Sequence, residues 1–176
     1  MREEYAGERI RLDRRLNVFT SRKVRYLLLI INIIWMVVIF SFSAQPASES
    51  SETSTKVGTI VGKVLKPGFS ELPKEEQIQY VRKIEFPIRK LAHATEYAIL
   101  GALMSLFFFS WNRKCYGLYG WLWGILYAIT DELHQSFVPG RSCQMTDVAI
   151  DSLGCMFGCT AIALLMSIRR KRWKKD

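Results

Sequence analysis

Four long apolar runs constrain this 176-residue chain more than any other feature. Charged residues make up 23% of the sequence, but they gather at the two ends and in one central stretch, which leaves the runs nearly free of charge. A helix of about 20 apolar residues is long enough to cross a bilayer. The pattern predicts an all-α membrane protein, a bundle of four transmembrane helices with short amphipathic outer helices. The expected spans are residues 26–44, 88–111, 115–134 and 147–168.

The first run is expected to remain in the protein as an anchor. A basic leader before an apolar stretch resembles a signal peptide, but residues 26–44 exceed the roughly 7–15 residues of a cleavable hydrophobic region. Phe42, Ser43 and Ala44 also make a poor cleavage site, because a bulky residue stands where a small one is required.

Residues 45–87 form a polar outer loop of mixed charge between the first two spans. We expect residues 47–54 to cap a short amphipathic helix that stops at Pro67 and Gly68, and Pro73 to begin a second short helix. Neither is long enough to cross the membrane, so both are expected to lie at its interface or over the bundle. Apolar residues recur at helical spacing in the first of them, at Val57, Ile60, Val61, Val64 and Leu65.

Much of the positive charge, which leaves the chain at +9, lies near its ends. Residues 1–25 and 169–176 are basic segments that flank spans, and such segments mark cytoplasmic ends and attract anionic lipid. Arg113 and Lys114, between the second and third spans, fall on the same side. We therefore expect a multi-pass protein of the cell membrane with both termini cytoplasmic. Nucleic acid is not expected as a partner, because no recognition module accompanies the charge.

The four cysteines are not arranged as a disulfide framework or a metal site, since no C-x-x-C spacing is present. Cys155 and Cys159 lie one helical turn apart in the fourth span, where a buried cysteine behaves as a small apolar residue. Packing is therefore the expected role for this pair. Gly154 and Gly158 have the spacing that allows two membrane helices to approach closely.

Ionisable residues interrupt the second run and follow the third. An ionisable residue at membrane depth is expensive, so it must pair, face a polar cavity or perform a task. Helical spacing places Lys90, His93, Glu96 and Tyr97 along one face of the second span. A second group follows the third span and begins the fourth, at Asp131, His134, Gln135, Arg141, Asp147 and Asp151.

The predicted topology puts both groups at the outer face of the membrane. Because short connections make the three spans neighbours, the groups are expected to converge on one site, with side chains within roughly 20 Å of each other. The residue types suit a metal, a phosphate or acid–base chemistry. No H-E-x-x-H spacing is present, so neither a tightly bound zinc ion nor another cofactor is expected.

Three ordered motifs resemble the VanZ-like family of bacterial membrane proteins. They are KLAHATEY at 90–97, DELHQSFVPGR at 131–141 and DVAIDSLG at 147–154, and FSFSAQP at 40–46 is similar too. The resemblance covers roughly residues 35–165 and implies a transmembrane domain at 26–168. It also implies a link to the cell envelope, because the founding member raises resistance to the glycopeptide antibiotic teicoplanin. Asp151 stands where many relatives carry Asn, which weakens any role that requires an amide there.

Two mechanisms are open for such a site. In the first, the protein is an enzyme that modifies a lipid-linked or phosphate-bearing envelope precursor. His93 or His134 is then the acid–base group, with Arg141 and Lys90 holding the anion. In the second, a non-catalytic protein binds membrane lipid or a lipid-linked precursor, and the same residues form a clamp. A transporter is disfavoured, because the spans show no inverted repeat or broken helices. The candidate catalytic residues are His93, Glu96, Asp131, His134, Arg141 and Asp147, and the candidate substrate-binding residues are Lys90, Tyr97, Gln135 and Asp151.

Structural roles compete with these functions at several positions. His93 and Glu96 could form only a hydrogen-bonded pair within the bundle. Glu132 is expected to be a solvated acid at a helix end, and the place of Arg141 beside carboxylates favours an ion pair. Trp121 is expected to anchor its span at the membrane interface.

Overall fold

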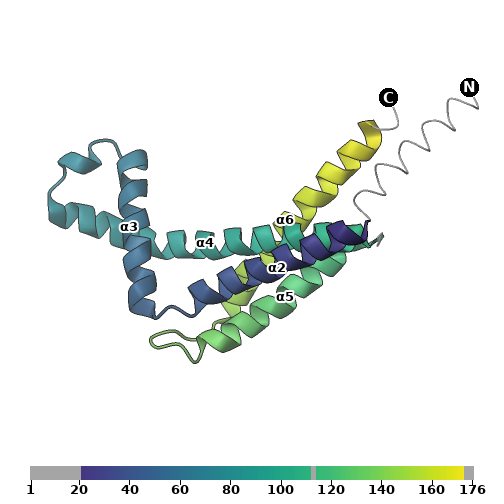
Figure 1. The fold of residues 1–176 in the computed structure, drawn as a ribbon. Helices are drawn as coiled ribbons and strands as arrows, with labels where there is room; N and C mark the ends of the chain where they lie inside the picture. The colour runs from purple at the N-terminus through teal and green to yellow at the C-terminus, as the bar shows by residue number, and fades with distance from the viewer. Residues whose placement is uncertain (1–20, 112–113, 173–176) are drawn as a thin grey trace, which may run out of the picture.

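The computed structural model describes residues 21–111 and 114–172, and within these ranges all regular structure is helical. The elements are α2 (Arg22–Ser43), α3 (Ala47–Leu65), the short 3-10 helix η1 (Phe69–Glu71), α4 (Lys74–Ser110), α5 (Tyr116–Gln135) and α6 (Met145–Arg172), as drawn in Figure 1. The all-α prediction is confirmed. Most of the basic segment predicted at 1–25, Arg113, and the end of the basic tail at 169–176 lie outside the described residues.

Three of the described helices are long and apolar enough to cross a membrane, namely α2, α4 and α6 as far as Arg169. The 20 residues of α5 are about the number that a span needs. Glycine, tyrosine and tryptophan recur along α5, however, and Asp131 and Glu132 lie near its end. Length and composition therefore identify three of the four expected spans, but they do not identify α5 as a span.

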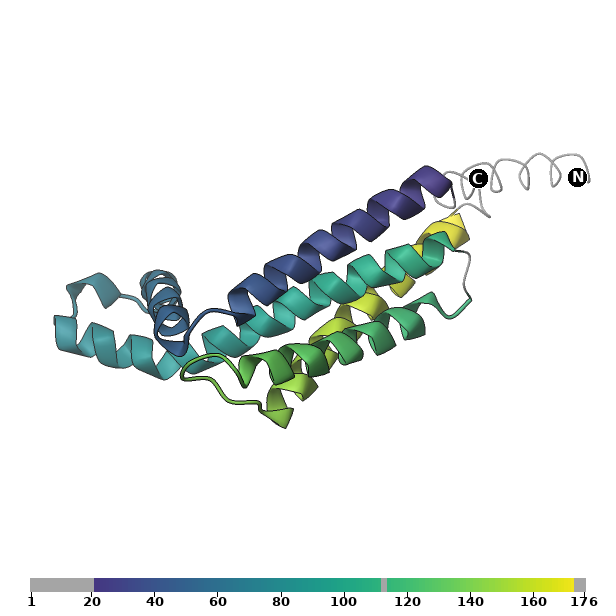
Figure 2. The same ribbon diagram turned by 60° about the horizontal axis from the view of Figure 1, so that its bottom comes forward.

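The central helix is α4, which contacts α2, α3, α5 and α6. In Figure 2, α2, α4 and α5 run side by side, and α4 and α5 are the antiparallel neighbours that their short connection predicts. The start of α2 and the end of α6 lie at one end of the bundle (Figures 1 and 2). At the opposite end, which we call the α3 end, α3 lies across α4 and residues 136–144 connect α5 to α6.

The segment between the first two spans differs from the prediction. Residues 47–54, expected only to cap a helix, are themselves the first turns of α3. The short helix expected after Pro73 is continuous with the second span, so that α4 runs through Pro87 without a break. Pro87 removes one helical hydrogen bond, but the first half of α4 packs closely on α3 at Gly58. The predicted stop at Pro67 and Gly68 is confirmed, because Gly68 adopts a left-handed conformation with φ 72° just after α3 ends.

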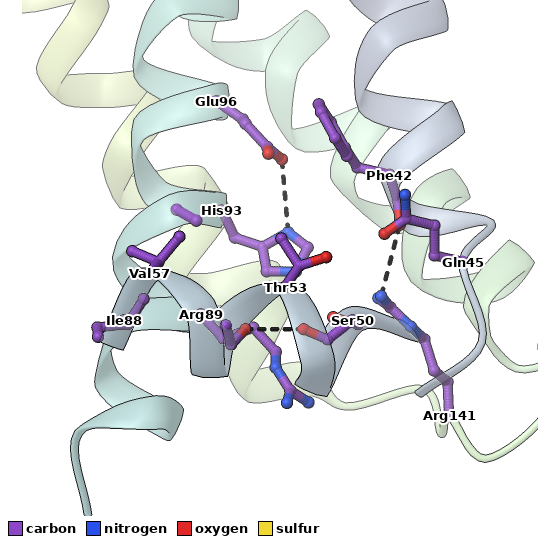
Figure 3. A pocket seen from close by; sticks show the side chains of 12 residues that line it. Phe42, Gln45, Ser50, Thr53, Val57, Ile88, Arg89, His93, Glu96 and Arg141 are labelled. Carbon is purple, nitrogen blue, oxygen red and sulfur yellow. Dashed lines mark hydrogen bonds and ion pairs between the residues drawn. The ribbon is translucent and has the colours of Figure 1, made fainter. Parts of the chain in front are cut away.

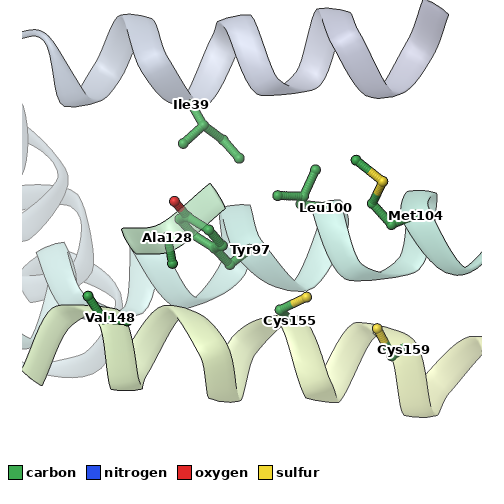
Figure 4. Packing of buried hydrophobic residues seen from close by; sticks show 8 residues of the cluster. All are labelled: Ile39, Tyr97, Leu100, Met104, Ala128, Val148, Cys155 and Cys159. Carbon is green, nitrogen blue, oxygen red and sulfur yellow. The ribbon is translucent and has the colours of Figure 1, made fainter. Parts of the chain in front are cut away.

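Small residues let α6 pack tightly on α4. A Cβ atom added at Gly154 or Gly158 would collide with the backbone carbonyls of Ala94 and Ala98. Cys155 and Cys159 are 0% and 5% exposed and belong to the main apolar cluster, which Figure 4 shows between the helices. The close approach predicted for the two glycines and the packing role predicted for the two cysteines are confirmed.

Polar side chains fasten α2 to α4 along the bundle. Trp35 Nε1 donates to the Glu96 carbonyl at 3.0 Å, and Asn32 Nδ2 donates to the Leu103 carbonyl at 3.3 Å. Trp121, expected to be an interface anchor, joins α5 to α6 by donating from Nε1 to the Ser152 carbonyl at 3.0 Å. Its indole N–H is therefore satisfied within the bundle, and its place at the membrane interface stays a prediction.

Candidate functional site

A cavity of about 170 Å³ lies at the α3 end of the bundle. Figure 3 shows that side chains from distant parts of the chain meet around it. Its lining is formed by Phe42 and Gln45 at the end of α2, Ser50, Thr53, Ser54 and Val57 of α3, Ile88, Arg89, Ala92, His93 and Glu96 of α4, and Arg141 of the loop after α5. The cavity therefore contains His93, Glu96 and Arg141, which the sequence predicted as site residues.

His93 and Glu96 lie one helical turn apart on α4 and point into the cavity (Figure 3). His93 Nδ1 is 3.8 Å from Glu96 Oε2, which is too long for a hydrogen bond. The two side chains are only 14% and 18% exposed, and neither of these atoms has a hydrogen-bond partner in the described part of the chain. Buried polar groups are normally bonded, so both atoms are available to a ligand or to water.

Arg141 reaches the cavity from the loop between α5 and α6. Its Nη1 donates to Gln135 Oε1 at 3.0 Å, and its Nη2 donates to the Phe42 carbonyl at 3.4 Å. Burial lowers the pKa of the guanidinium, the charge of nearby Arg89 lowers it further, and carboxylates at longer range oppose both effects. Among the described residues Arg141 forms no ion pair, so the ion pair expected from the sequence is not found. Its positive charge is left without a paired anion.

Behind Arg141, hydrogen bonds fix the orientation of Gln135. Asp131 Oδ2 accepts from Gln135 Nε2 at 3.1 Å and from Ser43 Oγ at 2.8 Å. Asp131 is 3% exposed, and Gln135 is buried as well. The carboxylate holds the amide nitrogen of Gln135, so the amide oxygen faces Arg141. This network links α2, α5 and the loop.

Lys90 and Asp147 form an ion pair between α4 and α6. Both side chains are largely buried, and neither lines the cavity. Lys90 is therefore neutralised by Asp147 rather than free to hold an anion in the cavity. The pair joins the first motif to the third at the α3 end of the bundle.

The three remaining predicted residues lie away from the cavity. Tyr97 is completely buried in the apolar cluster, with its ring 6.2 Å from that of Tyr127. Asp151 is 1% exposed, and neither carboxylate oxygen has a hydrogen-bond partner among the described residues. His134 packs against Phe40 of α2, with ring centroids 4.3 Å apart.

A model of the VanZ/LLP1 family matches residues 28–166, from the first turns of α2 to near the end of α6. The protein belongs to the VanZ/LLP1 family. The resemblance that the three motifs carry is thereby confirmed, and every element that lines the cavity falls within the VanZ/LLP1 match. No curated protein and no solved structure matches the chain.

Sequence reasoning missed several residues of the VanZ/LLP1 cavity and its support. Arg89 directly precedes Lys90, and it donates from Nη2 to Glu85 at 2.7 Å and to Ser51 Oγ at 2.8 Å. Ser43, the partner of Asp131, lies within the FSFSAQP motif, which was the available signal for it. The hydroxyl-rich residues 50–54 were assigned to a helix cap, and nothing in the local sequence indicates that α3 lies across α4.

Glu132 also differs from the prediction. It was expected to be solvated, but it is 1% exposed, and its Oε2 accepts from the backbone N–H of Gln144 at 2.8 Å. The loop after α5 folds back over the end of this helix and buries the carboxylate. Glu132 therefore fixes the loop that carries Arg141.

The VanZ/LLP1 cavity combines a histidine–glutamate pair, several hydroxyl groups and Arg141, a cation with no ion-pair partner in the described part of the chain. A guanidinium suits carboxylate and phosphate oxygens because it offers several N–H donors in one plane. In the part of the chain that the structure describes, no group of three or more histidine, cysteine or acidic side chains is arranged to hold a metal ion. Anion binding and proton transfer are the two chemistries that this arrangement suits.

Proposed function

We propose that this membrane protein binds an anionic, phosphate-bearing group of a cell-envelope precursor in the cavity beside Arg141. The observation that carries the proposal is the Arg141 guanidinium, which lines the cavity without an ion-pair partner among the described residues. Arg141 is only half-buried, so its charge is partly withdrawn from water and would gain from a nearby anion. A bound phosphate supplies the missing negative charge, and the cavity hydroxyls supply further donors.

The position of the site in the envelope is part of the same proposal. We infer that α5 is a fourth span, because its 20 residues run antiparallel to α4 within the bundle. Four spans put both termini in the cytoplasm, as the basic ends require, and they put the cavity at the outer face of the cell membrane. A protein that holds an envelope precursor there would change how a glycopeptide antibiotic reaches that precursor. This would account for the link between the VanZ-like family and teicoplanin resistance.

The test is ligand retention by variants of Arg141. Protein purified in mild detergent is mixed with phosphatidylglycerol, and bound lipid is counted by native mass spectrometry with glycerol phosphate as a soluble competitor. Arg141→Gln should weaken binding by about tenfold or more, because a charge-assisted hydrogen bond contributes about 1.5–3 kcal/mol. Arg82→Gln is the matched control, since Arg82 is exposed on the outer half of α4. Equal retention by Arg141→Gln and the natural chain contradicts the proposal.

Acid–base catalysis on the bound group is a second candidate function. It is favoured by one observation, the placement of the His93–Glu96 pair in the same cavity as Arg141, with both facing atoms free of hydrogen bonds among the described residues. A catalytic base must lie within hydrogen-bond reach of the proton that it moves. His93 lines the same cavity as Arg141, whereas His134 packs on Phe40 and is not among the lining residues.

Substitution of the two histidines separates catalysis from binding. Membranes that contain lipid-linked precursors are incubated with each variant, and new lipid products are sought by mass spectrometry. If the protein is an enzyme, His93→Gln loses product formation while it retains lipid, and the control His134→Gln keeps both. Binding without any product from the natural chain rules out the catalytic reading and leaves the binding function in place.

A further inference from the structure

The volume of the cavity limits what part of a ligand it can enclose. Pockets that bury a complete small molecule usually measure about 300–1,000 Å³, and this cavity measures about 170 Å³. That volume accommodates a phosphate-sized head group, because a water molecule occupies about 30 Å³. The rest of any larger ligand must lie outside the cavity.

The lining of the cavity contains both polar and apolar side chains. His93, Glu96 and Arg141 are polar, while Phe42, Val57 and Ala92 are apolar and are exposed at the surface of the protein. An amphiphile fits such a lining, because its charged group can meet the polar residues while its chain crosses the exposed apolar ones. A fully water-soluble anion has no apolar part that could contact these exposed apolar residues.

In the described part of the chain, no hydrogen bond joins the end of α2 directly to α4 beside the cavity. Within the described residues, the last hydrogen bond from α2 to α4 before the α3 end is that of Trp35 with the Glu96 carbonyl. Beyond it, α2 is held by α5, through Ser43 and Asp131 and through the ring contact of Phe40. The cavity occupies the space between the end of α2 and α4, as Figure 3 shows.

A roof over this space is formed by α3. Arg89 of α4 donates to Ser51 Oγ of α3 at 2.8 Å, and the N–H of Ala47 donates to the Pro139 carbonyl at 3.2 Å. Helix α3 is therefore held both by α4 and by the loop after α5. Near its end, α3 exposes Ile60, Val64 and Leu65. A helix that lies across the spans and exposes apolar residues suits the membrane interface, which would leave the space beneath it facing the lipid.

We propose that the cavity is entered sideways from the lipid, between α2 and α4 beneath α3, and that its ligand is a phospholipid or lipid-linked phosphate. The head group sits between Arg141 and His93, and the chains remain in the bilayer and cross Phe42, Val57 and Ala92 at the opening. This inference rests on the proposed function and names its ligand class.

The test uses a phosphatidylglycerol analogue with a photoreactive diazirine near the head-group end of an acyl chain. The full-length protein is reconstituted in phosphatidylcholine nanodiscs that contain the analogue, and adducts are located by peptide mass spectrometry after illumination. We expect adducts concentrated at residues 42, 57 and 88–92. They should be lost in Arg141→Gln, which releases the head group, and in Ala92→Phe, which fills the opening.

Ala149→Phe is the control for added bulk, because Ala149 is also exposed on a helix at the α3 end and does not line the cavity. This variant should keep the adducts. Adducts spread evenly over all lipid-facing helices, or unchanged in Ala92→Phe, overturn lateral entry. If glycerol phosphate still binds in an Arg141-dependent manner in that case, the proposed function stands and only the lipid entry fails. If Arg141→Gln changes the binding of neither the phosphatidylglycerol analogue nor glycerol phosphate, the proposed function and the lateral entry are both contradicted.

Discussion

At the scale of single residues, two buried aspartates of the bundle differ in what surrounds them. Asp131 accepts hydrogen bonds from Ser43 and Gln135, whereas Asp151 has no donor among the described residues although it is just as buried. The desolvation of a carboxylate is offset only where donors face it. Asp131 is therefore expected to stabilise the fold, and Asp151 to be tolerated at a cost.

Alanine substitutions test this difference. Asp131→Ala should lower the free energy of unfolding by about 1–3 kcal/mol, because two buried polar partners lose their acceptor. Asp151→Ala removes a carboxylate without donors and should leave the stability unchanged or raise it. The measurement is reversible unfolding in mixed detergent micelles. Equal destabilisation by the two variants would show that Asp151 has a partner that the geometry does not provide.

At the scale of elements, the contact between α4 and α6 determines the spacing of the whole bundle. Gly158 and Gly154 bring the backbone of α6 against Ala98 and Ala94 of α4. The same approach brings Asp147 within reach of Lys90 at the α3 end. Tight packing of these two helices therefore supports the part of α4 that carries His93.

The added methyl group in Gly158→Ala should force α6 away from α4. Overpacking of this kind costs about 1–3 kcal/mol, so the variant should show less monodisperse protein in fluorescence-detected size-exclusion chromatography and lower thermal stability. Gly117→Ala is the matched control, because the nearest atom to its added Cβ, the Cys159 carbonyl oxygen, lies 4.0 Å away. Its stability should be unchanged or slightly higher, since alanine favours helix more than glycine does. Equal behaviour of the two variants contradicts this account of the interface.

At the scale of the whole molecule, the number of spans determines whether the loop that carries Arg141 lies on the same side of the membrane as α3. The start of α2 and the end of α6 share one end of the bundle. If α5 crosses the membrane with the other three helices, the two ends of α5 lie on opposite sides. If α5 stays on one side, they lie together, and the end of α6 moves to the opposite side from the start of α2.

Two natural cysteines report on this choice, because Cys115 and Cys143 are exposed and lie just before and after α5. A membrane-impermeant maleimide applied to intact cells should label Cys143 and leave Cys115 unlabelled until the cells are opened. Cys143→Ser and Cys115→Ser assign the signal, while the buried Cys155 and Cys159 should not react. Labelling of both exposed thiols from outside, or of neither, would exclude four spans.

The sequence by itself determined the membrane class, the family and, for α2, α5 and α6, the bounds of the helices within a few residues. These properties are local, because hydrophobic length identifies a span and a motif such as KLAHATEY is read along the chain. It also placed His93 and Glu96 on one helical face, since that relation depends only on the period of a helix.

Only the tertiary structure decided which polar residues share a cavity and which are paired elsewhere. Lys90 and Arg141 are both cations at the α3 end, but Lys90 is bound to Asp147, whereas Arg141 has no ion-pair partner within residues 21–111 and 114–172. The burial of Glu132 and the path of α3 across α4 likewise depend on contacts between segments far apart in the chain. Sequence spacing fixes neighbours within a helix, whereas contacts between helices depend on how the backbones approach, which here is set by glycines on α6 and the close packing of α3 on α4.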